Sequence, residues 1–304
     1  MGRPMGGQAI RLWRKALAGL AGLAALGVAA GFLGALHPVG DSFSVFRPVF
    51  AGLALASGLA LRPRGPRLAV MVALTLLLGW HGWQGLRPDW QGASRLTLYQ
   101  KNLYFQNDAR DSLLADLRAR SADIVTLQEV SNANAALLEA LRADYPHQLY
   151  CPLSPNLGEV VLSRHPFVPD TSECSRRDAL AIVQVAAPAG PVWIISVHLG
   201  WPWPRGQAAQ VTRALPHLSS VSGPAVVAGD FNAVAWSYTV ARIASATQTR
   251  RVGRQLATLR LPVTGIPIGI DHVLSTGPGR VRTLPLLGSD HAGLWAELDP
   301  WATE

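Results

Sequence analysis

Two long stretches without a charged side chain lie in the first ninety residues, and they constrain the fold more than any other feature of this sequence. Residues 16–36 form an uncharged run of 21 residues, and residues 68–86 form a second run of 19. At about 1.5 Å per residue, a helix of either run is long enough to cross the roughly 30 Å hydrocarbon core of a bilayer. The first run exceeds the apolar core of a signal peptide and is followed by more apolar sequence. We therefore expect it to stay in the protein as a membrane anchor.

A shorter apolar segment lies between these two runs. Residues 48–61 carry no charge, which is too short for a full span. The segment lengthens to residue 43 if the Arg47 side chain reaches toward the membrane surface. The sequence thus predicts a membrane anchor over residues 1–90 with three transmembrane helices, at about 16–36, 43–61 and 68–86. Whether the middle segment crosses the membrane fully stays open.

The positions of the basic residues predict the sidedness of the anchor. Arg62, Arg64 and Arg67 lie in the short connection before the last run, and the N-terminus has its own cluster of Arg and Lys. Short segments rich in Arg and Lys stay on the cytoplasmic side. Both can do so only if the chain crosses out and back between them. We therefore expect a multi-pass protein of the cytoplasmic membrane with residues 91–304 on the extracytoplasmic side.

The formal net charge of +8 comes almost entirely from the anchor. Residues 1–90 contain nine Lys and Arg against two acidic residues, whereas residues 91–304 contain 18 basic and 17 acidic residues. Binding to a phosphate backbone usually relies on an excess of Lys and Arg. A nearly neutral second part makes nucleic acid a possible but less favoured partner. The membrane bilayer is the expected partner of the first part, and no protein partner is predicted.

The two cysteines, Cys151 and Cys174, lie in the second part of the chain. They cannot form a four-ligand structural zinc site by themselves. They could form a disulfide in an oxidising compartment, or they could be two unrelated buried thiols. The sequence alone does not decide between these alternatives.

Residues 91–304 alternate between short apolar strands and amphipathic helices, which predicts an α/β domain. The predicted strands are 96–102, 123–129, 160–163, 179–185, 192–198, 225–230, 271–274 and the segment after residue 291. The predicted helices are 111–120, 132–145 and 205–218. Residues 87–94 form the linker to the anchor.

Polar side chains follow most of these strands directly. They are Asn102, Glu129, His198, Asp230, Asn232, Asp271, Asp290 and His291. Each alone is an ordinary turn residue, since Asp, Asn and Glu are common there. Because strands that end at one edge of a sheet bring such residues together, we expect a single site.

Several motifs in this set resemble the endonuclease/exonuclease/phosphatase (DNase I-like) superfamily. They are Leu-Gln-Glu-Val (127–130), Gly-Glu-Val-Val-Leu-Ser-Arg-His-Pro (158–166), Ser-Val-His-Leu (196–199), Gly-Asp-Phe-Asn-Ala (229–233), Ile-Asp-His-Val (270–273) and Ser-Asp-His (289–291). The resemblance covers roughly residues 95–300. It implies a two-sheet α/β sandwich with the site at one rim.

The resemblance also implies a bound divalent cation. Asn102, Glu129 and Asp290 are the expected metal ligands, with Glu129 as the principal one, and their oxygens suit Mg²⁺ (or Mn²⁺). Many nuclease members carry an acidic residue two positions after the first Asn, where this chain has Tyr104. The metal would then rest on fewer carboxylates.

The remaining site residues are expected to carry the chemistry of hydrolysis. His291 is the expected general base, with an ordinary pKa near 6.5, and Asp271 is expected to orient it. Asp230 would position the attacking water, and Asn232 and His198 would donate hydrogen bonds to the phosphoryl oxygens. His272 receives no role.

We therefore expect a membrane-anchored, metal-dependent hydrolase of a phosphodiester or pyrophosphate, with a lipid-linked substrate favoured by the anchor. One alternative is a membrane-tethered extracytoplasmic endonuclease of the DNase type. The arginines between the Gly-Asp-Phe-Asn motif and Asp271 could contact DNA or anionic head groups. A second alternative is a catalytically inactive surface binding module that has kept the fold.

Overall fold

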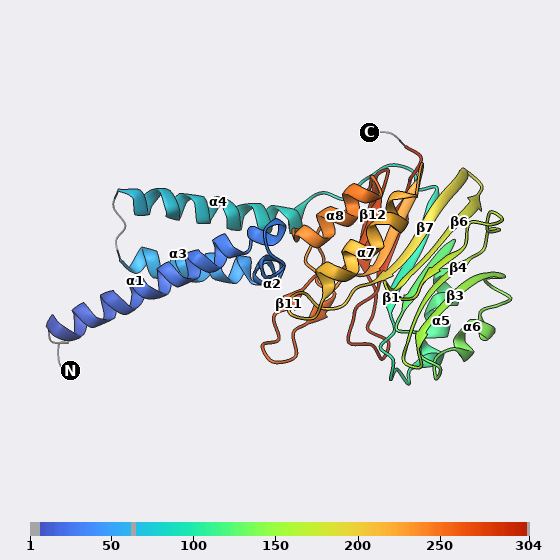
Figure 1. Cartoon of the computed structure of the whole chain (residues 1–304), viewed down its shortest axis with the longest axis horizontal. Coiled ribbons are helices and arrows are strands. Elements are labelled where there is room, and N and C mark those ends of the chain that lie inside the picture. Colours follow the sequence, from blue (N-terminus) through green and yellow to red (C-terminus); the bar gives the residue numbers. More distant parts are fainter. Residues whose placement is uncertain (1–6, 62–64, 303–304) are drawn as a thin grey trace. The chain divides into compact units, whose positions relative to one another are not determined.

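The structure is a computed structural model that describes residues 7–61 and 65–302. The chain divides into two compact units, residues 1–86 and residues 87–304 (Figure 1). The first unit is helical and the second contains all the β-strands that the structure describes. The two units are described separately below.

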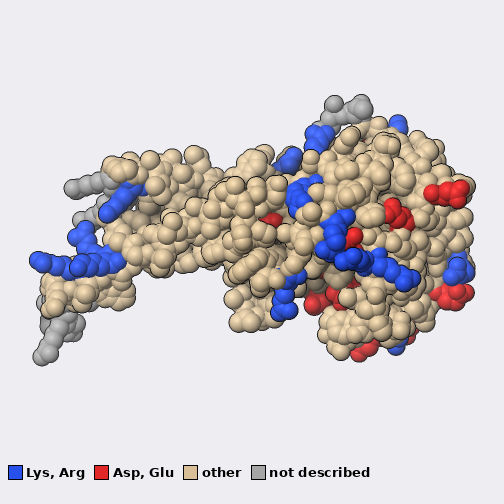
Figure 2. Space-filling model, in the orientation of Figure 1, with Lys and Arg blue, Asp and Glu red and all other residues tan. Residues whose placement is uncertain are grey.

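The helical unit contains two helices that are long and apolar enough to cross a membrane, α1 (Gly7–Ala30) and α4 (Pro66–Leu86). Between them lie the 3₁₀ turn η1 (Leu33–Ala35) and the helices α2 (Val39–Val45) and α3 (Arg47–Ala60). The last two meet at an angle of 65°, so they form either one broken span or a re-entrant loop. Residues 7–61 and 65–302 therefore contain two candidate spans, or three if the bent pair is one span. Figure 2 shows few charged atoms over this unit.

The break between α2 and α3 lies next to a buried arginine. Pro48 favours a new helix here because its ring is compatible only with the first turn. The Arg47 side chain is buried, donates from Nη2 to the carbonyl oxygen of Gly31, and lies 3.8 Å from the centre of the Phe32 ring. The prediction that Arg47 reaches outward was wrong. The carbonyl groups at the end of α1 lack helical partners and attract a cation into the unit instead.

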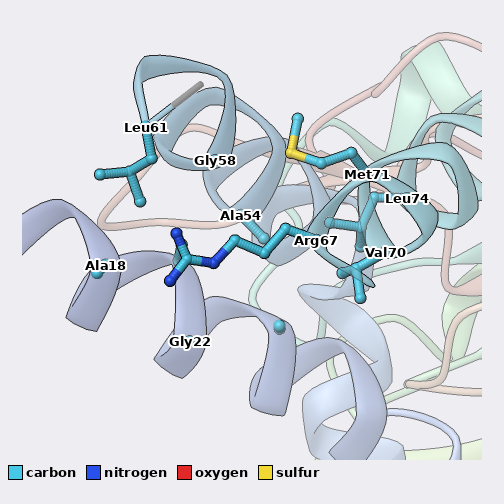
Figure 3. Close-up of a pocket in the computed structure, with 11 residues that line it drawn as sticks. Ala18, Gly22, Ala54, Gly58, Leu61, Arg67, Val70, Met71 and Leu74 are labelled. Carbon is cyan, nitrogen blue, oxygen red and sulfur yellow. The ribbon is translucent and has the colours of Figure 1, made fainter. Parts of the chain in front are cut away.

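The predicted sidedness depends on Arg62, Arg64 and Arg67, of which Arg62 and Arg64 lie outside the described residues. Arg67 lies in the first turn of α4 and lines a cavity of about 240 Å³ between α1, α3 and α4. Figure 3 shows its side chain extending between the small residues of the neighbouring helices, among them Gly22 and Ala54. Small residues of this kind allow membrane helices to approach closely.

The second unit contains two mixed six-stranded sheets. The first sheet has the spatial order β13 (Gly279–Thr283), β14 (Leu294–Leu298), β1 (Leu96–Asn102), β2 (Ile124–Gln128), β4 (Leu157–Ser163), β3 (His147–Ser154). The second sheet has the order β5 (Glu173–Ser175), β6 (Leu180–Ala187), β7 (Gly190–His198), β8 (Ala225–Asp230), β12 (Asp271–Ser275), β9 (Arg250–Arg251). The strands β10 (Leu259–Arg260) and β11 (Pro267–Ile268) form a separate short ribbon.

Each sheet buries one face against the other sheet and one face under helices. Leu98 of β1 and Val161 of β4 share a core between the sheets with Val183 of β6 and Val226 of β8. The helices α5 (Arg110–Arg120) and α6 (Ala136–Ala140) cover the outer face of the first sheet. The helices α7 (Gln207–Ser219) and α8 (Tyr238–Ala246) cover the second. The prediction of a two-sheet α/β sandwich is therefore confirmed.

Some elements differ from the prediction for physical reasons. The helix expected over residues 132–145 shortens to α6, because turns occupy the residues before it and after it. Asn132 and Asn134 favour such turns, since their side chains compete for backbone hydrogen bonds. The strand β3 was not predicted; its side chains are mostly half-exposed and it contains Pro152. The helix α8 was not predicted either, although Ser237 caps it by accepting from the backbone N of Val240 at 3.1 Å.

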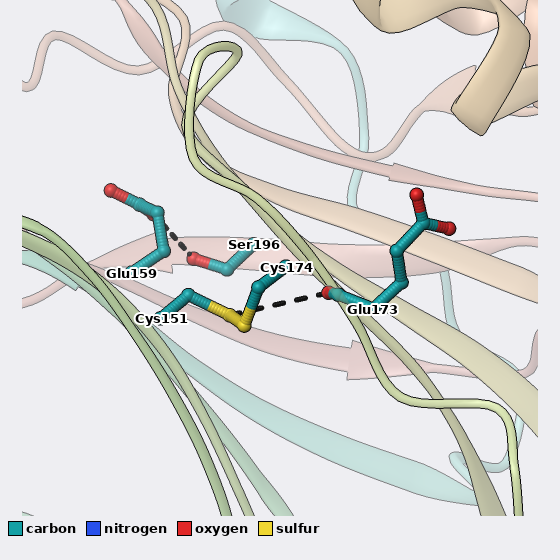
Figure 4. Close-up of a disulfide and its surroundings, with 5 residues drawn as sticks. All are labelled: Cys151, Glu159, Glu173, Cys174 and Ser196. Carbon is teal, nitrogen blue, oxygen red and sulfur yellow. Dashed lines mark hydrogen bonds between the residues drawn. A yellow bond between two sulfur atoms is a disulfide. The ribbon is translucent and has the colours of Figure 1, made fainter.

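The two cysteines form a disulfide between the sheets. Cys151 of β3 and Cys174 of β5 have Cα atoms 5.5 Å apart and are bonded through their sulfur atoms (Figure 4). The bond joins an edge strand of one sheet to an edge strand of the other. The alternative of two unrelated thiols is therefore excluded.

Candidate active site

The inward-facing side chains of the central strands change from apolar to polar toward one edge of the sandwich. Every second residue of a strand faces the same side. In β1, Leu98 lies in the core between the sheets, and the next inward positions are Gln100 and Asn102. In β8, Ala228 lies in the same core and Asp230 follows it inward. The sequence of each strand thus places a polar group at the same edge.

The neighbouring strands repeat this pattern. Parallel strands end at this edge and antiparallel strands begin there, as the pairing of Asp230 with Asp271 shows. The polar inward positions of these strands are Gln128 in β2, Glu159 in β4, Ser196 and His198 in β7, and Asp271 in β12. The site is therefore built from six strands and both sheets.

Asn102 connects the two sheets at the centre of the site. Its Nδ2 donates to Oε1 of Glu129 at 3.1 Å and to Oδ2 of Asp230 at 3.0 Å. Its Oδ1 accepts from the backbone N of Tyr104 at 2.9 Å. The second oxygen of Glu129 accepts from the backbone N of Phe105 at 3.1 Å. Glu129 itself has a φ of 54°, a left-handed conformation that is costly for a non-glycine residue and turns its carboxylate toward the site.

Glu129 and Asp230 offer the carboxylate oxygens that a hard divalent cation prefers, and Asn102 offers its amide oxygen to the same place once its amide group turns by 180° and exchanges Oδ1 with Nδ2. Burial, together with the charge of Asp271, raises the pKa of Asp230 to about 6. A buried group of carboxylates is stabilised by a cation of compensating charge, so these residues fit a divalent metal. Asp230, Asp271 and His291 also bring ligand atoms within 4.8 Å of one another. We favour the set around Glu129, because Nδ1 of His291 is already engaged by Asp271.

Asp290 lies at the surface of the site. Its side chain is exposed, and its charge acts on His291 and Lys101. Among the described residues, the hydrogen bonds of Glu129 and Asn102 go to other partners than Asp290. Its role as a metal ligand stays a prediction.

The predicted pairing of His291 with Asp271 is present. Nδ1 of His291 lies 2.8 Å from Oδ2 of Asp271, and Nε2 of His291 lies 3.8 Å from Oδ2 of Asp230. Burial lowers the pKa of His291, but the charge and hydrogen bond of Asp271, with the charges of Asp230 and Asp290, outweigh it and raise this pKa to about 10. A divalent cation bound beside these carboxylates would offset part of their negative charge and lower the pKa of His291 toward its ordinary value.

Residues of β1 form hydrogen bonds with the loop that contains His291. Lys101 is fully buried and donates from Nζ to the carbonyl oxygens of His291 at 3.0 Å and Pro285 at 3.1 Å. Ser289 donates to the carbonyl oxygen of Asn102 at 2.8 Å and accepts from the backbone N of His291 at 3.0 Å. Burial lowers the pKa of Lys101 to about 8. Lys101 was not predicted, because it lies on the face of β1 that points away from the core.

A second histidine also lies beside Asp230. Nε2 of His198 lies 3.7 Å from Oε1 of Glu129 and 3.7 Å from Oδ2 of Asp230. Its Nδ1 lies 3.7 Å from Oε1 of Glu159. Glu159 is completely buried, which raises its pKa well above the ordinary value. No role was predicted for Glu159, although an acidic residue inside the apolar run Gly-Glu-Val-Val-Leu was a usable signal.

A buried chain of hydrogen bonds joins the two histidine–carboxylate pairs. Gln100 donates from Nε2 to Oδ1 of Asp271 at 3.0 Å and to Oε1 of Gln128 at 2.8 Å. Gln128 donates to Oγ of Ser196 at 2.9 Å, and Ser196 donates to Oε2 of Glu159 at 2.8 Å (Figure 4). This chain fixes both carboxylates, because each member has a defined partner in a dry interior.

The remaining predicted residue, Asn232, supports Asp230. Its backbone N donates to Oδ1 of Asp230 at 2.8 Å, and its Nδ2 donates to the carbonyl oxygen of Leu199 at 2.8 Å and to Oδ2 of Asp230 at 3.2 Å. Its predicted contact with a phosphoryl oxygen stays a prediction. His272 points to the other face of β12, where its Nε2 lies 2.8 Å from the carbonyl oxygen of Ala233.

Comparisons with known proteins agree with this geometry. The model of the Endonuclease/Exonuclease/phosphatase family matches residues 100–291. A search of curated protein sequences found no match.

Three solved structures with the same fold were compared with this chain. D. rerio TDP2 complexed with a single strand DNA product has a TM-score of 0.55 and 16% sequence identity, covering 66% of this chain and 97% of that one. TDP2 from C. elegans has a TM-score of 0.52 and 14% identity, covering 76% and 83%. Beta toxin from Staphylococcus aureus with bound magnesium ions has a TM-score of 0.50 and 13% identity, covering 68% and 100%.

The family match spans the strands that supply Asn102, Glu129, His198, Asp230 and His291, so sequence and geometry identify the same residues. This chain belongs to the Endonuclease/Exonuclease/phosphatase family and is a metal-dependent hydrolase acting on phosphate ester bonds.

Proposed function

We propose that the protein is a membrane-anchored phosphoesterase that hydrolyses a phosphodiester or pyrophosphate of a lipid-linked substrate by attack of an activated water. The proposal rests on the observation that two histidines lie beside the same oxygen of Asp230: Nε2 of His198 is 3.7 Å and Nε2 of His291 is 3.8 Å from Oδ2 of Asp230, and each ring has a buried carboxyl group near its Nδ1. Such an arrangement provides one group to take a proton from water and another to assist the leaving oxygen.

In this proposal His291 takes the proton of the attacking water through Nε2, while Asp271 holds the ring by its Nδ1. Asp230 orients the water, and Asn232 holds Asp230. His198, whose Nε2 also lies near Oδ2 of Asp230, donates a hydrogen bond to a phosphoryl oxygen or to the leaving oxygen. Its ring is oriented by Glu159.

Asn102, Glu129 and Asp230 would hold the divalent cation, with Asp290 as a further or outer ligand. The bound cation supplies electrostatic stabilisation of the charge that develops on the phosphoryl oxygens. We propose Mg²⁺ as the native ion, with Mn²⁺ as a substitute, because the ligand set consists of oxygens.

Several observations support a lipid-linked substrate. α1 and α4 are long and apolar enough to cross a membrane, and a short linker follows α4. The loop after His198 exposes Trp201 to 42% and Trp203 to 50%, and tryptophans of this kind favour the membrane–water interface. The charges of the catalytic unit nearly cancel, so it has little of the net positive charge that favours binding to a DNA backbone.

The disulfide supports an extracytoplasmic catalytic unit, because such bonds persist in oxidising compartments. Three membrane spans with a cytoplasmic N-terminus agree with this placement. We therefore propose a multi-pass protein of the cytoplasmic membrane with its active site on the outer side.

The test is hydrolysis by purified full-length protein in detergent, with lipid phosphodiesters, a polyprenyl pyrophosphate and plasmid DNA assayed side by side. We expect release of phosphate or head group from a lipid substrate, abolished by EDTA and restored by Mg²⁺. The variant His291→Ala should lose this activity, while Glu139→Gln, an exposed change on α6, should keep it. Efficient cleavage of DNA with no action on lipids would replace the proposal by the tethered nuclease. Absence of all hydrolysis would favour the inactive binding module.

A further inference from the structure

The exposed apolar side chains of the catalytic unit lie around its active site. Over residues 87–302, the large hydrophobic side chains that are exposed are Trp201, Trp203, Tyr238, Val263 and Leu286. They lie in four segments that connect to strands at the catalytic edge, here called the rim segments: residues 199–206, 231–238, 252–270 and 284–290. These segments follow His198 and Asp230 and precede Asp271 and His291. Single exposed hydrophobic residues are ordinary, but a group of them around one site marks an interaction surface.

The turn between β10 and β11 has the most exposed of these side chains. Val263 is 97% exposed. The backbone N of Leu261 donates to the carbonyl oxygen of Ile266 at 3.0 Å and closes the turn. Residues 261–268 read Leu-Pro-Val-Thr-Gly-Ile-Pro-Ile and contain no charged side chain, and Figure 1 shows this ribbon projecting from the body of the unit. Because turns in water are usually built from polar residues, an apolar turn indicates contact with an apolar partner.

Hydrogen bonds connect the rim segments around the catalytic residues. Gln207, at the start of α7, donates from Nε2 to the carbonyl oxygen of Phe231 at 3.0 Å and so connects the tryptophan loop (residues 199–206) with the segment before α8. The backbone N of Phe231 donates to the carbonyl oxygen of Ile270 at 2.9 Å, at the end of the segment that contains the ribbon. Leu259 of the ribbon forms a β-bridge with His291. The rim segments therefore follow one another around the site and can contact one surface together.

The charges of the rim segments suit the head groups of a lipid bilayer. The tryptophan loop contains Arg205, and the segment before β12 contains Arg254 and Arg260; all three residues are exposed. In the sequence of the four segments, Asp290 is the one acidic residue. Guanidinium groups match the oxygens of phosphate. Tryptophan and aliphatic side chains together with arginines are typical of surfaces that lie in the membrane interface.

The chain brings a bilayer close to these segments. In the proposed function, on which this inference rests, α4 crosses the membrane. Leu86 ends α4 and Leu96 begins β1. The extended backbone between them reaches at most roughly 35 Å, so the catalytic unit stays near the bilayer surface. The bilayer is therefore the apolar partner that the rim segments encounter at the highest effective concentration.

We propose that the rim segments dock the catalytic edge onto the surface of the lipid bilayer. The turn at Val263 and the tryptophan loop enter the head-group layer, and Arg205 and Arg260 contact the phosphates of that layer. The catalytic residues inside the rim then face the bilayer. This docking selects a phosphate ester that lies in the membrane over the same ester in solution.

Fluorescent labelling of the full-length protein in nanodiscs tests this docking. The discs contain phosphatidylcholine and phosphatidylglycerol, with or without a lipid that carries a doxyl quencher near its head group. Both native cysteines are in the disulfide, so an introduced cysteine provides the one thiol for an environment-sensitive dye. We expect the doxyl lipid to quench dyes on Val263→Cys and on Leu286→Cys. Ala189→Cys is the matched control and should not be quenched, because Ala189 is exposed in the turn between β6 and β7, at the opposite end of these strands.

A charge in the ribbon turn tests whether the rim segments dock together. Val263→Asp places a carboxylate where the apolar side chain enters the head-group layer, and the fold should be unaffected because Val263 is almost fully exposed. With the dye on Leu286→Cys, the ratio of quenched to unquenched protein should fall about tenfold. Ala189→Asp is the control for the added charge and should leave this ratio unchanged.

Other occupants of the surface give different results. Dyes at positions 263 and 286 that are quenched no more than the dye at position 189 would overturn the proposal. A dye that is shielded from iodide in solution but not quenched by the doxyl lipid would also overturn it, in favour of a protein partner or a second copy of the chain. A blue shift that appears only when single-stranded DNA is added would overturn it in favour of a nucleic-acid surface.

The catalytic variant His291→Ala separates docking from hydrolysis. It should dock like the wild-type protein, since the rim segments are unchanged. Docking by a wild-type protein that hydrolyses no phosphate ester would contradict the proposed function alone. Hydrolysis of lipid phosphates by a protein whose dyes are not quenched would contradict the docking surface alone.

Discussion

The charge and hydrogen bond of Asp271 raise the pKa of His291. This pair therefore provides a direct test of the mechanism. Replacing Asp271 by Asn removes the negative charge that raises the pKa of His291 to about 10. In the metal-free protein the pKa should therefore fall by at least one unit, toward or below its ordinary value, and the ring should lose its proton at a lower pH. NMR of the labelled imidazole nitrogens measures this directly. Hydrolysis should fall about 10²-fold or more, because the base loses its orientation. An unchanged titration of His291 would contradict the pairing.

Glu159 provides a second test, because it acts on the reaction only through His198. We expect Glu159→Gln to keep the hydrogen bond from Ser196 but to remove the titratable carboxyl group beside Nδ1 of His198. Activity should fall about tenfold or more, and the pH profile of kcat/KM should change shape, which a purely structural role would not cause. The conservative Glu159→Asp variant should recover part of the activity. A profile that shifts neither in height nor in shape would show that Glu159 only fills the core.

His272 should make folding sensitive to acid. Complete burial lowers its pKa from 6.5 to about 4. As the pH falls below 6.5, the unfolded chain takes up a proton that the folded protein accepts only near pH 4. The stabilising contribution is therefore present above pH 6.5 and is lost between these values, by an amount on the order of 3 kcal/mol. His272→Gln keeps an amide donor for the carbonyl oxygen of Ala233 and should remove this part of the pH dependence. Chemical unfolding of both proteins at pH 7 and pH 4.5 provides the comparison.

At the scale of whole elements, the disulfide is the clearest source of stability that can be tested. It closes a loop between residues 151 and 174, and a loop of this length corresponds to about 3 kcal/mol of unfolding free energy. Cys151→Ala/Cys174→Ala should therefore lower the melting temperature by several degrees. A reducing agent should do the same to the wild-type protein and have no effect on the variant. Equal melting curves would show that the bond is absent in solution.

Continuous apolar strands could be predicted from the sequence, and strands with mixed exposure could not. The predicted ranges 96–102 and 225–230 coincide with β1 and β8, because polar residues limit both apolar runs. In β3 the exposure of the side chains follows no period of two, so it gave no signal. The middle apolar segment breaks at Phe46, next to the buried Arg47, whose side chain donates to the carbonyl oxygen of Gly31 just after α1. That contact between distant residues could not be inferred locally.

The same contrast holds for the site. Residues at strand ends, such as Glu129 and His291, could be predicted because the motifs mark them. Gln100, Gln128 and Ser196 lie inside strands, and their importance depends on how the two sheets face each other. The sequence alone does not show how the two sheets pack against each other. The pKa of His291 could not be predicted for the same reason, since it depends on carboxylates from several strands.

For the molecule as a whole, the anchor should matter more for a membrane-bound substrate than for a soluble one. We expect removal of residues 1–86 to reduce hydrolysis of a lipid-linked phosphate in vesicles by about 10²-fold or more, because confinement at the membrane raises the effective substrate concentration. Hydrolysis of a soluble phosphodiester should change little. Equal losses on both substrates would show that the first unit stabilises the fold instead. A reporter fused after residue 304 tests the sidedness, and activity of a cytoplasmic reporter there would refute the extracytoplasmic placement.

The disulfide also lies beside the buried carboxyl group of Glu159. Cys151 stands directly opposite Glu159 in the pairing of β3 with β4, and both side chains are fully buried (Figure 4). A β5 strand released by reduction would let solvent reach the flank of Glu159, whose raised pKa depends on dryness. Its carboxyl group would then ionise at a lower pH, and the chain of hydrogen bonds toward Asp271 would change with it. Reduction of the disulfide between the edge strands would therefore change the pH at which groups of the active site titrate.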